Sequence, residues 1–164
     1  MRKMIALCLV MFFCCTSSLS PAFADEPQAV QVVVNVADGI FTINDEIPQL
    51  AYLPYLSETG VTMAQMDVIT DAFGAQVAQD GDAITITYAG VEMKFFIGNT
   101  NAFIGENEVM MPELPVRVDG YIMMPLRFLC ECFGADVTVD PETGNISISS
   151  INLADGTEVD FRML

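Results

Sequence analysis

Arg127 and Glu131 are the residues whose charges and spacing most resemble a functional pair. Residues four apart share one face of a helix, so these two side chains are placed to form an ion pair. Arg127 would alternatively reach into a sheet, to a strand-end carbonyl or to Asp140. The chain contains no His, which excludes Ser-His and Cys-His nucleophiles and imidazole bases. We therefore expect both residues to be structural.

Cys130 and Cys132 form a C-x-C pair, a spacing that also occurs in redox and soft-metal sites. On a helix, residues two apart point to nearly opposite sides. Cys130 falls on the apolar stripe that runs from Leu126 to Phe133, so it should be buried, whereas Cys132 should lie off that stripe. A disulfide between them would require a broken helix, so we expect free thiols.

The chain is also rich in methionine. It has 11 Met, including the pairs Met110-Met111 and Met123-Met124. Thioether and thiolate sulfur are the ligands that copper(I) prefers. Adjacent residues of a strand face opposite sides, however, so neither Met pair can point into one site. Core filling is the favoured interpretation, and a copper(I) site is the alternative.

Acidic residues gather in short loops at matched places along the chain. The loops are Asp45-Glu46, Asp80-Gly81-Asp82, Glu106-Asn107-Glu108 and Asp140-Pro141-Glu142. Their oxygens would suit weak extracellular calcium, but none has the full spacing of a calcium loop. Solvated turns are the favoured interpretation.

The composition limits the possible partners. The 164 residues carry 22 acidic against 6 basic side chains, a net charge of -16. Nucleic acids and anionic membrane surfaces are therefore not expected partners, because binding a polyanion requires clustered Lys or Arg. With 52% apolar residues, the chain can bury a core of one domain or of two small fused units.

Residues 1–24 have the pattern of a signal peptide. Arg2 and Lys3 precede an apolar run from Ile5 to Cys15, and small residues at Ala22 and Ala24 form a cleavage site. We expect a secreted or cell-envelope protein that begins at Asp25, with no membrane span in the mature chain. The alternative is an uncleaved N-terminal anchor. We expect residues 25–30 to form a short flexible segment before the first strand.

Strand patterns occupy most of the remaining chain. Runs of β-branched and aromatic residues flank short turns that contain Asp38-Gly39, Ala89-Gly90 and Asp155-Gly156. The sequence therefore predicts three hairpins, formed by residues 31–36 with 40–43, 83–88 with 91–97, and 145–149 with 157–163.

Helical spacing occurs in only two places. The first helix is predicted to follow Thr62 as N-cap, and the second to begin at Pro125 as its first residue. Gly74 and Gly134 are the predicted C-terminal caps. The apolar positions are Met66, Ile69 and Phe73 in the first helix, and Leu126, Leu129, Cys130 and Phe133 in the second.

The two helical segments are similar to each other. Residues 61–80 and 121–140 align without gaps and are identical at six of twenty positions. Strand residues on either side also align, including 90–95 with 156–161. We interpret the chain as two copies of one unit, residues 31–97 and 98–164, that share a sheet or a face.

The second copy resembles the N-terminal, or stalk, domain of copper amine oxidases. The resemblance rests on a Gly-containing turn, a strand, a Pro-Leu-Arg helix start, a helix with a Glu, a Phe-Gly-Ala end, and a strand ending in Asp. The motif residues are Pro125, Leu126, Arg127, Glu131, Phe133, Gly134, Ala135 and Asp140. The first copy is degenerate, because it has Gln65-Met66-Asp67 at the Pro-Leu-Arg positions. The family's Trp before the final Asp is Val139 here.

This resemblance implies an α+β fold in which an antiparallel sheet wraps around a helix, with a non-catalytic role. It implies no copper, because the oxidase chemistry of the namesake enzymes lies in another domain. We expect an exported structural or interaction module with no cofactor, acting on an unidentified protein or envelope component or by self-association. The alternative is an extracellular copper(I) or weak calcium binder.

Overall fold

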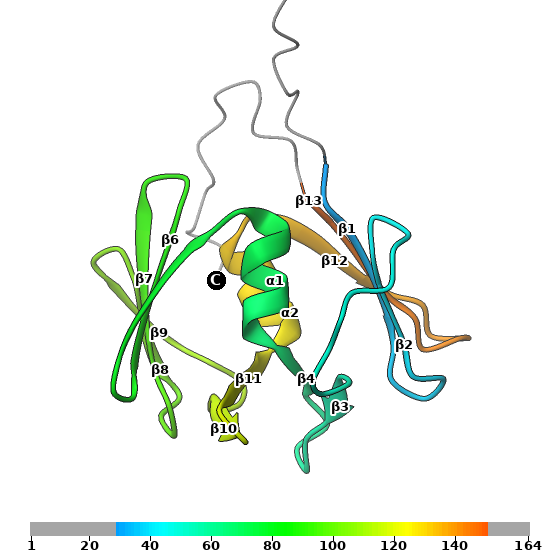
Figure 1. Cartoon of the computed structure of the whole chain (residues 1–164), viewed down its shortest axis with the longest axis horizontal. Helices are drawn as coiled ribbons and strands as arrows, with labels where there is room; N and C mark the ends of the chain where they lie inside the picture. The colour runs from blue at the N-terminus through cyan, green and yellow to red at the C-terminus, as the bar shows by residue number, and fades with distance from the viewer. Residues whose placement is uncertain (1–28, 151–164) are drawn as a thin grey trace, which may run out of the picture.

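The computed structural model describes residues 29–150, which form antiparallel sheets and two short helices (Figure 1). Two sheets, A and C, stand on either side of the helices, and sheet B lies at the foot of the helices. This is the α+β architecture that the sequence predicts. Within these residues, neither helix is long and apolar enough to cross a membrane.

Sheet A brings together strands from both ends of the described chain, in the order β12-β13-β1-β2. The predicted hairpin at residues 31–43 is confirmed as β1 and β2. β13 begins one residue later than predicted, and its predicted pairing with residues 157–163 is wrong, because β12 and β1 occupy its two edges. Residues 157–163 themselves lie outside the described residues. The strand bounds are Gln31–Asn35 (β1), Ile40–Ile43 (β2), Ala135–Val139 (β12) and Ile146–Ser150 (β13).

Sheet C contains the second predicted hairpin, which is confirmed as β6 and β7. Alternate residues of these strands are fully buried, because one face of the sheet packs on the core. Ala89 and Gly90 both have positive φ, as a two-residue hairpin turn requires. The strands, in sheet order, are Gln76–Asp80 (β5), Ala83–Tyr88 (β6), Val91–Phe96 (β7), Asn101–Ile104 (β8) and Asn107–Met110 (β9).

Sheet B is small and leads directly into both helices. Its central strands β4 and β11 are antiparallel partners, with Ala64 opposite Met124. The strands, in sheet order, are Val116–Val118 (β10), Tyr121–Pro125 (β11), Thr62–Gln65 (β4) and Tyr55–Leu56 (β3). The aligned segments 61–80 and 121–140 each run from a strand through a helix to a strand, and they meet in this sheet.

Helix α1, Met66–Phe73, and helix α2, Leu126–Cys132, occupy the predicted places but begin differently. Thr62 is not an N-cap, because pairing with β11 keeps residues 62–65 extended and the helix starts at Met66. Pro125 is not the first helical residue. It ends β11 opposite Met63, and its ψ of 110° places it at the N-cap position.

The helix ends follow the prediction more closely. Gly74 is the C-cap of α1 and adopts the left-handed conformation, with φ of 68°. In α2 the C-cap is Phe133, and Gly134 follows it with φ of 72°. Glycine is favoured at such positions because it has no Cβ to clash with the preceding carbonyl.

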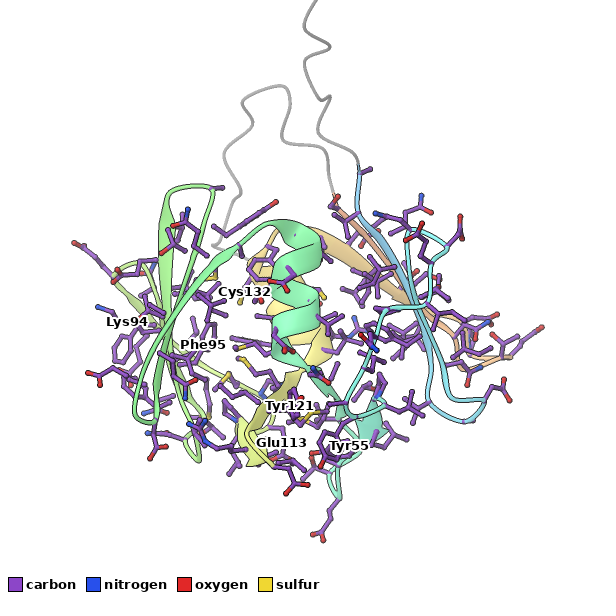
Figure 2. The ribbon with its side chains drawn as sticks, in the orientation of Figure 1. Tyr55, Lys94, Phe95, Glu113, Tyr121 and Cys132 are labelled. Carbon is purple, nitrogen blue, oxygen red and sulfur yellow. The ribbon has the colours of Figure 1, made fainter. Side chains whose placement is uncertain are left out.

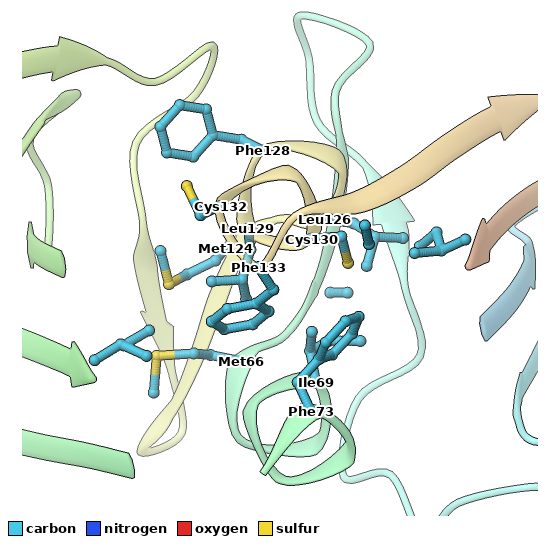
Figure 3. Close-up of a cluster of buried hydrophobic side chains, with 14 of the residues drawn as sticks. Met66, Ile69, Phe73, Met124, Leu126, Phe128, Leu129, Cys130, Cys132 and Phe133 are labelled. Atoms are coloured by element: carbon cyan, nitrogen blue, oxygen red, sulfur yellow. The ribbon is translucent and has the colours of Figure 1, made fainter. Parts of the chain in front are cut away.

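The two helices share one hydrophobic core with the flanking sheets (Figure 3). The rings of Phe73 on α1 and Phe133, which follows α2, lie 4.9 Å apart between their centres. Tyr88 of β6 approaches the Phe133 ring at 5.0 Å. The core thus joins both helices to sheet C, and both aligned segments contribute to it.

Candidate functional site

A groove of about 500 Å³ opens between the lower end of sheet A, the β3–β4 hairpin and the start of α2. Its walls are mainly apolar, and Leu56 and Val139 are 57% and 47% exposed. Arg127 is the one titratable residue in the lining. A guanidinium stays protonated at neutral pH and cannot act as a base. The groove therefore offers a contact surface without an acid–base pair.

Arg127 forms the predicted ion pair and also reaches sheet A, but through a carbonyl in the middle of β12 rather than a strand-end carbonyl or Asp140. Its Nη1 donates a hydrogen bond to the Val137 carbonyl of β12 at 3.3 Å and lies 3.6 Å from Glu131 Oε1. Asp140 is engaged elsewhere, because it accepts hydrogen bonds from the Thr143 hydroxyl and the Glu142 amide. These bonds lower the pKa of the Asp140 carboxyl, the Thr143 bond most. Arg127 therefore ties α2 to sheet A.

The buried side-chain amide of Asn35 fixes the side of the groove that the β1–β2 turn forms. Asn35, at the end of β1, is 4% exposed. Its Nδ2 donates to the Thr143 carbonyl at 3.2 Å and to Asn145 Oδ1 at 2.7 Å, while its Oδ1 accepts from the Asp38 amide at 3.0 Å. Asn35 thereby fastens the β1–β2 turn to the β12–β13 loop. Its polar atoms are used within the protein.

The remaining motif residues build the fold. Leu126 and Phe133 are almost completely buried, and Ala135 begins β12 on its buried side. Pro125 and Phe128 line the groove. The motif places a helix between sheets and gives the groove its floor.

Both cysteines lie in α2, and both are free and fully buried (Figure 3). The expectation that Cys132 lies off the buried stripe is wrong. A single stripe assumes one buried face, whereas α2 is enclosed on several sides and only Arg127 and Glu131 reach solvent substantially. Burial raises the pKa of both thiols. Their sulfur atoms point to different sides of the helix in Figure 3.

The methionine pairs differ in their surroundings. Met110, the last residue of β9, is 75% exposed, whereas Met111, which follows the strand, is buried. Met123 and Met124 are both fully buried, but only Met124 belongs to the main core. Among residues 29–150, no group of three or more Cys, Asp or Glu side chains is arranged to hold a metal ion.

Tyrosines and acids gather beside sheet B, where Figure 2 labels Tyr55, Tyr121 and Glu113, and the sequence did not predict this cluster. The Tyr52 hydroxyl donates to Asp119, and the Tyr52 and Tyr121 rings lie 6.0 Å apart. The bond to Asp119 raises the pKa of the Tyr52 phenol. Nearby, Glu113 accepts a 2.6 Å hydrogen bond from the Thr59 hydroxyl. These partners are far apart in sequence, so spacing alone gave no signal.

The described chain is an α+β protein with an apolar groove and a core shared by two strand–helix–strand segments. The copper amine oxidase N-terminal domain family has a sequence model that matches residues 42–148, more than half of the chain. The chain belongs to this family. The comparisons with curated proteins and with solved structures gave no match.

Proposed function

We propose that this chain is an exported, non-catalytic, stalk-type module that acts by contact at the cell exterior. The supporting observation is the groove, whose one titratable lining residue, Arg127, is already bound to Val137 and Glu131. A catalytic site needs a nucleophile or base within reach of a substrate. An apolar groove with internally satisfied polar groups is suited to binding.

In this proposal, residues 1–24 direct export and are removed, and residues 31–97 and 98–164 are two copies of one unit packed as one body. Within the described residues, each sheet combines strands from both copies. The family match supports the stalk-type assignment for most of this region. The partner is a protein or envelope component rather than a nucleic acid, because the chain carries a net charge of -16.

The test is binding of the purified chain to cell envelopes from the source organism, measured by co-sedimentation. The unmodified chain should bind saturably, and Val139→Asp should weaken binding at least tenfold because it places a charge in the groove. Val77→Asp is the matched control. Val77 is also an exposed valine on an edge strand, but it lies on β5, away from the groove.

Equal binding of both variants, or no saturable binding of the unmodified chain, would contradict the proposal. Export is tested separately by N-terminal sequencing of protein recovered from the envelope or medium. We expect a start at Asp25, and an intact Met1 would remove the exported half of the proposal.

A further inference from the structure

Sheet A pairs strands from opposite ends of the described residues 29–150. β1 pairs with β13 along four residues, from Gln31 opposite Ser149 to Val34 opposite Ile146. Val30, just before β1, donates its amide to Ser150 Oγ, a residue 120 positions away. The chain has no short turn that would force this pairing to occur within one molecule.

Sheet C has the same arrangement within one continuous stretch of chain. There, β7 lies beside β6 in the place that β1 takes beside β13, and a two-residue turn joins the two strands. The corresponding residue pairs are Ile84–Phe95 and Ile86–Met93 in sheet C, and Ile146–Val34 and Ile148–Val32 in sheet A. The edge of β13 thus accepts any strand with the β1 pattern, whichever copy supplies it.

The β1–β2 hairpin, residues 31–43, is internally paired and buries its apolar side chains against the rest of the fold. Its side chains Val32, Val34 and Phe41 are almost completely buried in the core. Exposing them to water is unfavourable, so the hairpin is stable only against a β13 strand. Asn35 adds polar bonds to the β12–β13 loop, and these bonds would form equally well between two copies.

The segment that joins the hairpin to sheet B, residues 44–54, contains no helix or strand, only an isolated bridge between Ile43 and Glu46. Asn44 and Asp45 have φ of 51° and 64°, in the left-handed region that Asn and Asp adopt more readily than other residues with a Cβ. The tight turn is closed by paired backbone bonds between Ile43 and Glu46. The Asn44 amide donates to the Gln31 carbonyl, and the Gln31 amide donates to Asn44 Oδ1, so this turn belongs to the hairpin. Extending residues 47–54 would therefore move the hairpin to a second copy while its internal pairing is kept.

We propose that copies of this chain associate by exchanging the β1–β2 hairpin, so that β1 of one copy pairs with β13 of a second copy. This inference rests on the proposed interaction role and names one partner, a second copy of the same chain. The exchanged hairpin also supplies Asn35, Val36 and Ala37 to the groove, which is then built from two copies. Low concentration favours the closed monomer, and high concentration favours exchange.

The test uses two full-length chains of different mass, one carrying Gln31→Cys and the other Ser149→Cys. Both positions are exposed and lie opposite each other in the β1–β13 pair. Each chain also carries Cys8→Ser, Cys14→Ser and Cys15→Ser, while Cys130 and Cys132 are buried. The chains are mixed at high concentration, warmed to just below the unfolding midpoint, cooled and oxidised.

We expect a covalent heterodimer whose yield rises with concentration. The matched control replaces Ser149→Cys by Asp136→Cys, an exposed position on β12 that faces Ser149 rather than β1. The correct pair should give at least tenfold more heterodimer than the control. Equal yields, or no heterodimer at any concentration, would overturn the proposal.

A single chain with both Gln31→Cys and Ser149→Cys checks the pairing itself. It should form an internal disulfide at low concentration, and failure to do so in a folded chain would also overturn the proposal. The envelope-binding assay separates this inference from the proposed function. Saturable envelope binding without heterodimer would reject hairpin exchange alone, whereas loss of envelope binding would reject the interaction role.

Discussion

Replacing Phe133 by alanine should destabilise the whole described fold. The side chain is 2% exposed, and its ring contacts Phe73 at 4.9 Å and Tyr88 at 5.0 Å, measured between ring centres. Removing a buried phenylalanine costs about 3–5 kcal/mol, which includes the cavity that is left. Loss of two aromatic contacts places Phe133→Ala near the middle of that range, about 4 kcal/mol.

Urea unfolding followed by circular dichroism measures this change. With an m-value of about 2 kcal/mol/M, the loss corresponds to a midpoint lower by roughly 2 M urea. We expect one cooperative transition before and after the substitution, because many other residues of the same core still join both helices to the sheets. Phe133→Leu, which keeps most of the apolar volume, should cost less than about 1.5 kcal/mol.

Phe103→Ala is the matched control for this experiment. Phe103 is a half-buried ring on β8 with Phe96 as aromatic neighbour at 6.4 Å, and we expect a cost of about 1 kcal/mol. If Phe133→Ala cost no more than Phe103→Ala, Phe133 would not connect the two halves of the core. An early separate transition in the Phe133→Ala variant would also contradict the reasoning.

Three further predictions concern the thiols, a tyrosine and copper. Cys130 and Cys132 should resist a thiol reagent in the native chain and react together in denaturant, because both thiols are buried and have a raised pKa. Rapid labelling of either thiol in the native protein would contradict this prediction. The pairing of Tyr52 with Asp119 favours the neutral phenol, so its stabilisation is present below the ordinary pKa of 10.0 and lost as pH rises through the raised value. Ultraviolet titration should therefore show one tyrosine titrating earlier in Asp119→Asn, and an unchanged curve would argue against the bond. Dialysis against copper(I) should leave no stoichiometric metal on the chain, because the Cys130 and Cys132 thiols point to different sides of α2. If copper were retained and then lost in a variant with Cys130→Ser and Cys132→Ser, the metal-binding alternative would be restored.

Local patterns predicted the elements of this fold well. The hairpins at residues 31–43 and 83–96 follow from β-branched runs around short turns, and the helix ends follow from Gly74 and Gly134. The helix starts were missed because pairing between β4 and β11 keeps residues up to Gln65 and Pro125 extended. Such pairing is a tertiary effect that local spacing does not contain.

The candidate site was predictable only in part. The helical spacing of Arg127 and Glu131 correctly indicated an ion pair. A contact of Arg127 with a sheet was also among the alternatives, but its carbonyl partner, Val137, lies in the middle of β12 rather than at a strand end. The groove itself was not predictable, because its walls come from segments about 100 residues apart in the chain. Cys132 was misplaced for a related reason, since enclosure of α2 on several sides depends on the packing of whole sheets.

The pairing of β1 with β13 also determines the order in which the sheets can form during synthesis. A ribosome makes about 5–20 residues per second, and Val30 and Ser150 are 120 positions apart, so β1 emerges roughly ten seconds before the strand it pairs with. During that interval the Val32 and Val34 side chains have no core to enter, and the strand has an open edge of the kind that promotes aggregation. Sheet C has no such delay, because β7 follows β6 after two residues. The nascent chain can therefore complete sheet C first, and sheet A waits for the last strand of the described chain.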